Sequence, residues 1–255
     1  MIHKIEQLFK KLGKSLMEHR SLGTFSGVMI GTQMKSDVDN YANDIIEKKL
    51  KKLTPDIPII SEENKRSHKT DRFKKYWLLD PLDGTASYCK GFSGFVIQIA
   101  LMQSHKPVLS VVYSPYFDQI YTAELNSGAF LNSKKISINY ENKKIVIIDN
   151  YPKPIGYTNY LFNNIPCHEY EEMGSFGLKI CRVADSCANL FVKNVLFKDW
   201  DIAPGHLIIE EAGGIVSDFN GNKIQYLGDL EKKDGLIVTN SIHTLQKVIE
   251  IKNNT

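Results

Sequence analysis

The stretch WLLDPLDGT at residues 77–85 carries the strongest structural signal in the chain. Its apolar first half predicts a buried strand, and two carboxylates, Asp80 and Asp83, follow that strand directly. Because Pro81 has no backbone N–H, we expect the strand to end there and the carboxylates to turn toward a common point. Gly84 allows a backbone conformation closed to other residues, so the N–H groups after it can face an anion. This loop could hold hard cations and a phosphate together.

Two more acidic positions lie in comparable places elsewhere in the chain. Glu62 follows a short apolar run at 57–60, and Asp201 opens a predicted helix. A few carboxylates are the ligands that Mg²⁺ prefers. Each residue alone has a plainer interpretation: Asp201 as a helix N-cap, and Asp39 as a solvated helix residue. The sequence indicates a metal site only when these residues are taken together.

The rest of the chain predicts a mixture of helices and strands. We expect a helix over 37–53, capped by Asp37 and ended by Pro55, then an antiparallel meander and finally alternating elements. The further strands are expected over 57–60, 76–79, 94–102, 107–114, 118–124, 128–131, 145–149, 214–218 and 235–239, and the further helices over 178–188, 201–212 and 241–250. The polar stretch 132–144 predicts a boundary between an N-terminal lobe, 1–135, and a C-terminal lobe, 136–255.

Composition and charge are those of an ordinary globular chain. The 255 residues are 42% hydrophobic, with a formal net charge of +3 and no basic block, so we expect no nucleic-acid partner. The spacing of Cys89, Cys167, Cys181 and Cys187 fits neither a zinc site nor a disulfide scaffold, so we expect reduced and mostly buried thiols. Without a run of about 20 apolar residues or a signal peptide, a cytoplasmic location is expected.

Residues 2–16 predict an amphipathic helix with lysines on its polar side. The favoured interpretation is that this helix packs on its own domain. Weak peripheral association with an anionic membrane surface is the alternative.

Together these motifs resemble the signatures of the inositol monophosphatase superfamily. The run at 77–85 is similar to the first signature, and WDIAPG at 200–205 with EAGG at 211–214 is similar to the second. Ser61-Glu62-Glu63 matches the acidic element upstream. The resemblance implies an α/β (α+β) fold, a layered αβαβα sandwich, and a Mg²⁺-dependent, lithium-sensitive phosphatase that acts on a small phosphorylated metabolite. It also makes a homodimer possible.

The resemblance also implies a role for each matching residue. The side chains of Glu62, Asp80, Asp83 and Asp201 and the carbonyl of Leu82 would hold two or three Mg²⁺ ions. Thr85, with Asp39 behind it, would orient and deprotonate the attacking water, and the N–H groups of Gly84 and Thr85 would bind the phosphate. Ser175 and Lys179 would contact the substrate, although a solvated surface lysine is the plainer interpretation of Lys179.

Within the superfamily, residues 53–58 and 106–115 are most similar to the CysQ-type 3'(2'),5'-bisphosphate nucleotidases. This similarity implies adenosine 3',5'-bisphosphate as substrate. Phe176 and Gly177 depart from that branch, which usually has two serines there. An inositol monophosphatase, a fructose-1,6-bisphosphatase-like enzyme, and a weakly catalytic homologue that binds RNA or protein are the alternatives.

Overall fold

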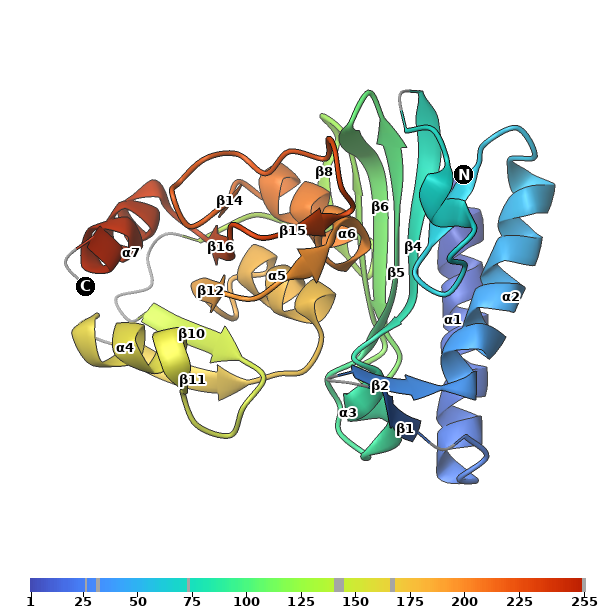
Figure 1. The fold of residues 1–255 in the computed structure, drawn as a ribbon, viewed down its shortest axis with the longest axis horizontal. Coiled ribbons are helices and arrows are strands. Elements are labelled where there is room, and N and C mark those ends of the chain that lie inside the picture. The colour runs from blue at the N-terminus through green and yellow to red at the C-terminus, as the bar shows by residue number, and fades with distance from the viewer. Residues whose placement is uncertain (26, 31–32, 73, 140–144, 166–167, 254–255) are drawn as a thin grey trace.

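Three layers of helices alternate with two sheets in the computed structural model, which describes residues 1–25, 27–30, 33–72, 74–139, 145–165 and 168–253. In Figure 1, α1 and α2 cover one face of a seven-stranded sheet, and α5 and α6 cover its other face. A five-stranded sheet follows, and α4 and α7 lie beyond it. The αβαβα sandwich expected from the sequence is therefore confirmed, whereas the lobe boundary near residue 135 stays a prediction.

The described part of the chain contains these longer helices: α1 (Ile2–Ser21), α2 (Asp37–Leu53), α4 (Gly156–Asn164), α5 (Phe176–Ala184), α6 (Asp199–Glu211) and α7 (Ile242–Asn253), with the short helix α3 (Thr85–Cys89) and the 3₁₀ turn η1 (Ser67–Lys69). Its strands are β1 (Gly27–Ile30), β2 (Gln33–Ser36), β3 (Ile59–Ser61), β4 (Lys75–Asp83), β5 (Val96–Gln103), β6 (Lys106–Ser114), β7 (Gln119–Glu124), β8 (Gly128–Leu131), β9 (Lys134–Ile136), β10 (Ile145–Asp149), β11 (His168–Glu172), β12 (Leu190–Lys193), β13 (Phe197–Lys198), β14 (Ile215–Ser217), β15 (Glu231–Lys232) and β16 (Leu236–Thr239).

The seven-stranded sheet runs in the order β3-β4-β5-β6-β7-β8-β9. Only β3 and β4 pair in parallel, so the predicted antiparallel meander is confirmed. The predicted end of the strand at Pro81 is wrong, because β4 continues to Asp83. Its pairing with β5 is irregular between Asp80 and Asp83, and such an irregularity accommodates a proline inside a strand. The expected polar boundary also contains a strand, β9.

The five-stranded sheet runs in the order β11-β10-β12-β16-β14. No sequence pattern predicted β11, β12 or α4: β12 has only four residues, and α4 has no clear apolar stripe. The cap of α2 is Ser36 rather than Asp37, since the Ser36 hydroxyl accepts a hydrogen bond from the N–H of Val38.

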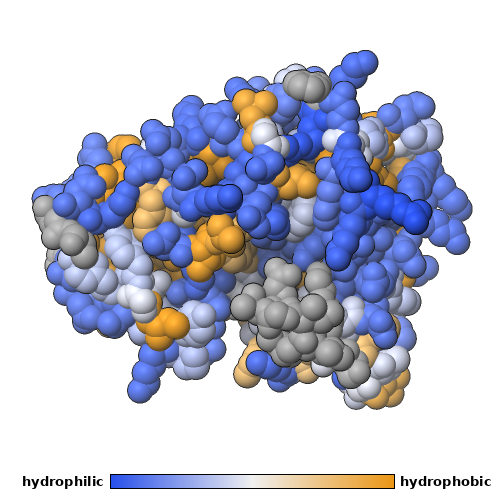
Figure 2. Space-filling model, viewed as in Figure 1, coloured by the Kyte–Doolittle hydropathy of each residue, from blue (hydrophilic) through white to orange (hydrophobic). Residues whose placement is uncertain are grey.

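Apolar side chains fill both faces of the seven-stranded sheet. On β5, Ile97, Ile99 and Leu101 pack toward α1 and α2, while Val96 and Ala100 pack toward α5 and α6. In a strand buried on both faces nearly every residue is apolar, and the sequence of β5 follows this pattern. Figure 2 shows that hydrophilic side chains cover most of one face of the molecule and that apolar ones appear there only in small areas.

Helix α1 turns its apolar side toward the seven-stranded sheet. Ile5, Phe9, Leu12 and Leu16 are buried in the core shared with β6, which confirms packing on its own domain. Among the described residues, no helix combines the length and the apolar character needed to cross a membrane. Association with a membrane surface stays a prediction.

The structure describes three free cysteines, and most of them are not buried. Cys181 is buried, Cys89 is half-buried and Cys187 is exposed. Only one of the three described thiols is buried, so the expectation of mostly buried thiols is wrong for this set. Cys167 lies outside the described residues. Cys187 is exposed because it follows the end of α5, where the chain turns at the surface.

Candidate active site

Three carboxylates from separate elements meet between the seven-stranded sheet and α6. Glu62 lies just after β3, Asp80 lies on β4, and Asp201 lies in the first turn of α6. One oxygen from each lies within 4.8 Å of one from each of the others. Asp83, the last residue of β4, is linked to the same group through a hydrogen-bonding neighbour, Gln98. The structure thus brings the four acidic side chains singled out in the sequence into one site.

Burial and the charges of neighbouring carboxylates raise the pKa values of Asp80, Asp83 and Asp201. Burial is the main cause of the strongly raised pKa of Asp80, and the charges of Glu62, Asp83 and Asp201 add to it. Burial likewise raises the pKa of Asp201 well above its ordinary value. The pKa of Asp83 rises to about 7, although the Gly177 N–H opposes the effect of burial. A buried cluster of this kind is stable only when protons or cations neutralise it.

The donor set fits Mg²⁺, which takes oxygen ligands and usually a few carboxylates. The N-cap interpretation of Asp201 is wrong, because Lys198 is the N-cap of α6 and Asp201 lies three residues after it. Asp201 Oδ2 accepts a hydrogen bond of 2.6 Å from the Lys198 N–H, which stabilises the start of the helix and leaves the other carboxylate oxygen for a cation.

Gly84 allows the loop after β4 to turn tightly. Its φ is +94°, and a Cβ at this position would lie 2.6 Å from the carbonyl oxygen of Gly94. Any other residue would therefore strain the backbone and collide with the neighbouring chain. The Leu82 N–H donates to Asp80 Oδ1 at 3.1 Å, which holds that carboxylate against the loop.

Thr85 and Asp39 form the pair expected from the sequence. Thr85 Oγ1 donates a hydrogen bond of 2.7 Å to Asp39 Oδ1, and the Ser36 N–H donates to Asp39 Oδ2 at 3.0 Å. Only 2% of Asp39 is exposed, so the interpretation of a solvated helix residue is wrong. Thr85 Oγ1 also lies 3.2 Å from the carbonyl oxygen of Leu82, which the sequence analysis assigned to metal binding.

A pocket of about 630 Å³ opens beside Asp83 and Gly84. Its wall contains three lysines, Lys90, Lys179 and Lys193. Gly94 and Gly174 pass so closely here that a Cβ on Gly174 would lie 2.0 Å from the Gly94 carbonyl oxygen. The pocket thus joins the carboxylate cluster to a region of positive charge.

Lys179 is buried, so its interpretation as a solvated lysine is wrong. Its Nζ donates to the carbonyl oxygen of Gly174 at 2.6 Å. Burial lowers the pKa of Lys179 to about 7, while the charge of Asp83 acts in the opposite direction. Ser175 also lines the pocket, but its Oγ accepts a hydrogen bond from the Leu178 N–H and caps α5.

Three site residues were missed by the sequence analysis: Gln98, Lys90 and Lys193. Gln98 left a usable signal, because it is one polar residue inside an apolar strand. Lys193 left none, since the strand β12 that carries it was not predicted. His206, on α6, packs against Tyr226: its Nδ1 lies 2.8 Å from the Tyr226 hydroxyl.

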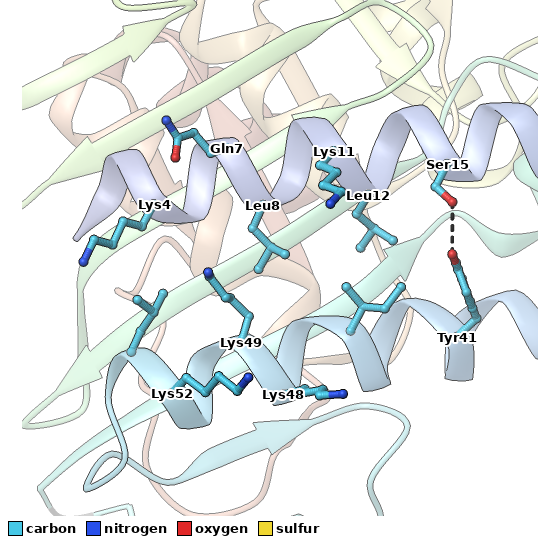
Figure 3. A pocket seen from close by; sticks show the side chains of 12 residues that line it. Lys4, Gln7, Leu8, Lys11, Leu12, Ser15, Tyr41, Lys48, Lys49 and Lys52 are labelled. Carbon is cyan, nitrogen blue, oxygen red and sulfur yellow. Dashed lines mark hydrogen bonds between the residues drawn. The ribbon is translucent and has the colours of Figure 1, made fainter.

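A second hollow, of about 790 Å³, lies between α1 and α2. Figure 3 shows Lys4 and Lys11 extending from α1 and Lys48, Lys49 and Lys52 from α2. Leu8 and Leu12 contribute its apolar floor, and Ser15 and Tyr41 join the helices by a hydrogen bond of 3.0 Å. No residue of the carboxylate cluster is among those that line this hollow.

A carboxylate cluster that can hold divalent cations, beside a glycine turn whose N–H groups can face an anion, fits a metal-dependent phosphomonoesterase. The model of the inositol monophosphatase family matches residues 2–253, and the chain belongs to this family. It is accordingly a phosphoric monoester hydrolase.

Known relatives agree with this assignment. The 3'(2'),5'-bisphosphate nucleotidase CysQ of Buchnera aphidicola is 34% identical over 89% of this chain and 87% of its own length. The Nus factor SuhB of Xylella fastidiosa is 30% identical over 84% of this chain and 80% of its own. Among solved structures, an IMPase of Thermotoga maritima superposes with a TM-score of 0.84 at 25% identity, covering 99% of this chain and 96% of that one.

Proposed function

We propose that the protein is a Mg²⁺-dependent 3'(2'),5'-bisphosphate nucleotidase that hydrolyses adenosine 3',5'-bisphosphate to AMP and phosphate. The observation that carries the proposal is the lysine-lined pocket beside the carboxylate cluster. A substrate with a second phosphate needs positive charge away from the reacting phosphate, and the exposed Lys90 supplies it on the pocket wall, whereas Lys193 is already paired with Asp149. The similarity to relatives named CysQ supports the same substrate class.

Glu62, Asp80, Asp83 and Asp201, with the Leu82 carbonyl, would hold two or three Mg²⁺ ions. When bound, Mg²⁺ supplies neutralisation of the phosphate oxygens and a lowered pKa for a coordinated water. The N–H groups of Gly84 and Thr85 would bind the phosphate, since the turn at Gly84 leaves the following N–H groups outside the β4 ladder.

Thr85 and Asp39 would move the proton of the attacking water. Because the Thr85 hydroxyl donates its hydrogen to Asp39, its lone pairs are left to accept a proton from water. As Thr85 Oγ1 takes that proton, its own proton can pass along the 2.7 Å hydrogen bond to Asp39. Burial strengthens this hydrogen bond, because no competing water reaches Asp39.

The test is phosphate release from adenosine 3',5'-bisphosphate, inositol 1-phosphate and fructose 1,6-bisphosphate, each with Mg²⁺ and then with added Li⁺. We expect the bisphosphate nucleotide to give the highest kcat/KM, and Li⁺ to inhibit. In Lys90→Met, KM for the nucleotide should rise about tenfold, the size of one lost charged contact, while KM for inositol 1-phosphate stays unchanged. Lys134→Met, on exposed β9, is the matched control. A preference for inositol 1-phosphate would overturn the substrate assignment.

A SuhB-type regulatory role is the second candidate, favoured by 30% identity to a Nus factor over 84% of this chain. The retained carboxylates and the Thr85–Asp39 pair support catalysis instead. A protein that binds Mg²⁺ but releases phosphate from none of the three substrates would favour the regulatory role.

A further inference from the structure

Gln98 lies at the centre of the candidate active site without being one of its expected ligands. It sits in β5 directly opposite Asp80 on β4, and none of its surface is exposed. Its Nε2 lies 3.3 Å from Asp80 Oδ2 and 3.3 Å from Asp83 Oδ2. One neutral amide therefore contacts two of the four carboxylates and adds no charge to the cluster.

The same amide nitrogen contacts the first turn of α6, which carries Asp201. Gln98 Nε2 lies 3.2 Å from the carbonyl oxygen of Trp200 and 3.2 Å from that of Asp201. In a regular helix, the N–H of residue 204 would bond to the Trp200 carbonyl. Residue 204 is a proline, which has no N–H, so this carbonyl lacks its helical partner. Gln98 Nε2 offers a donor to this carbonyl from the sheet, and its two hydrogens are shared among the four oxygens around it.

Helix α5 packs against the oxygen of the same amide group. A Cβ on Gly177 would lie 2.1 Å from Gln98 Oε1, so only glycine allows α5 to approach this closely. The Gly177 N–H in turn donates to Asp83 Oδ2 at 2.7 Å. Gln98 thus lies where β4, α5 and α6 meet.

We propose that Gln98 is a positioning residue that fixes Asp80 and Asp83 relative to Asp201 and so organises the cluster before a cation binds. This inference rests on the proposed metal site. A glutamate at 98 would add a further carboxylate to the cluster, and a lysine would compete with the cation, whereas an amide donates without doing either. Residues that orient ligands in this way commonly change metal affinity 10- to 100-fold when mutated.

The test compares three metal-free proteins: wild type, Gln98→Leu and Gln103→Leu. Gln103 lies on the same strand but is exposed, so it is the matched control. Calorimetric titration with Mn²⁺ and with Mg²⁺ should show affinity at least about tenfold weaker in Gln98→Leu and unchanged in Gln103→Leu. Gln98→Asn, which keeps the amide but is one methylene shorter, should show the same loss and serves if Gln98→Leu does not fold.

Thermal unfolding in EDTA tests the contact with α6. Pro204→Ala restores the N–H that the Trp200 carbonyl lacks, so the loss of melting temperature from Gln98→Leu should be smaller in that background. A purely structural role would lower the melting temperature without changing cation affinity, and that result would overturn the proposal. Failure of the wild-type protein to bind either cation would instead overturn the proposed function.

Discussion

Replacing Asp83 by asparagine should stabilise the metal-free protein while removing its activity. The pKa of Asp83 is raised from 3.8 to about 7, mainly by burial. At about 1.4 kcal/mol for each pH unit, the ionised side chain costs the folded state up to about 4 kcal/mol at pH 8. Water reaches part of this side chain, and screening lowers the gain that we expect from Asp83→Asn to about 2 kcal/mol.

The size of this effect depends on pH. A carboxyl whose pKa is raised in the folded state favours folding at low pH, and this stability is lost as the pH rises through the folded value. The stability difference between wild type and Asp83→Asn should therefore be smallest near pH 4, because Asp83 is then protonated when folded and still partly protonated when unfolded. The variant should become the more stable protein as the pH rises to about 7 and above.

The assay is urea unfolding in EDTA, followed by circular dichroism between pH 4 and pH 8.5. With saturating Mg²⁺, the wild type should become more stable than Asp83→Asn, because a ligand at 100 times its Kd stabilises the wild type by about 2.7 kcal/mol. Asp56→Asn, at an exposed loop position, is the control and should change neither result. A stability difference that does not vary with pH, or a variant less stable than wild type at pH 8 without metal, would refute the reasoning.

Three further substitutions test how the site is supported. Asp199→Ala leaves Arg72 without the ion pair now at 2.8 Å, and should lower the free energy of unfolding by about 3 kcal/mol in urea titrations. Glu211→Ala removes hydrogen bonds to two backbone N–H groups of the turn between β7 and β8, and should cost about 2 kcal/mol by the same measurement. Gly174→Ala should lower kcat/KM roughly a hundredfold by displacing the chain at Gly94, and an active variant would contradict the close packing.

Much of the fold was predictable because β5, β6 and β7 form from contiguous apolar runs joined by short turns. The elements that the sequence did not predict are short, like β12, or lack an apolar stripe, like α4. Their conformation depends on packing against other parts of the chain, which no local pattern records.

The sequence by itself determined the pair Asp80 and Asp83 and the glycine turn at Gly84, since these residues follow one another along the chain. Only the tertiary structure decided that Glu62 and Asp201 would meet, that Lys179 would be buried, and that Gln98 would lie beside the α6 carbonyl that Pro204 leaves without a helical partner. The physical reason is that burial and hydrogen-bond partners depend on which distant segments pack together. A motif fixes the chemistry of its own residues but not the neighbours that surround them.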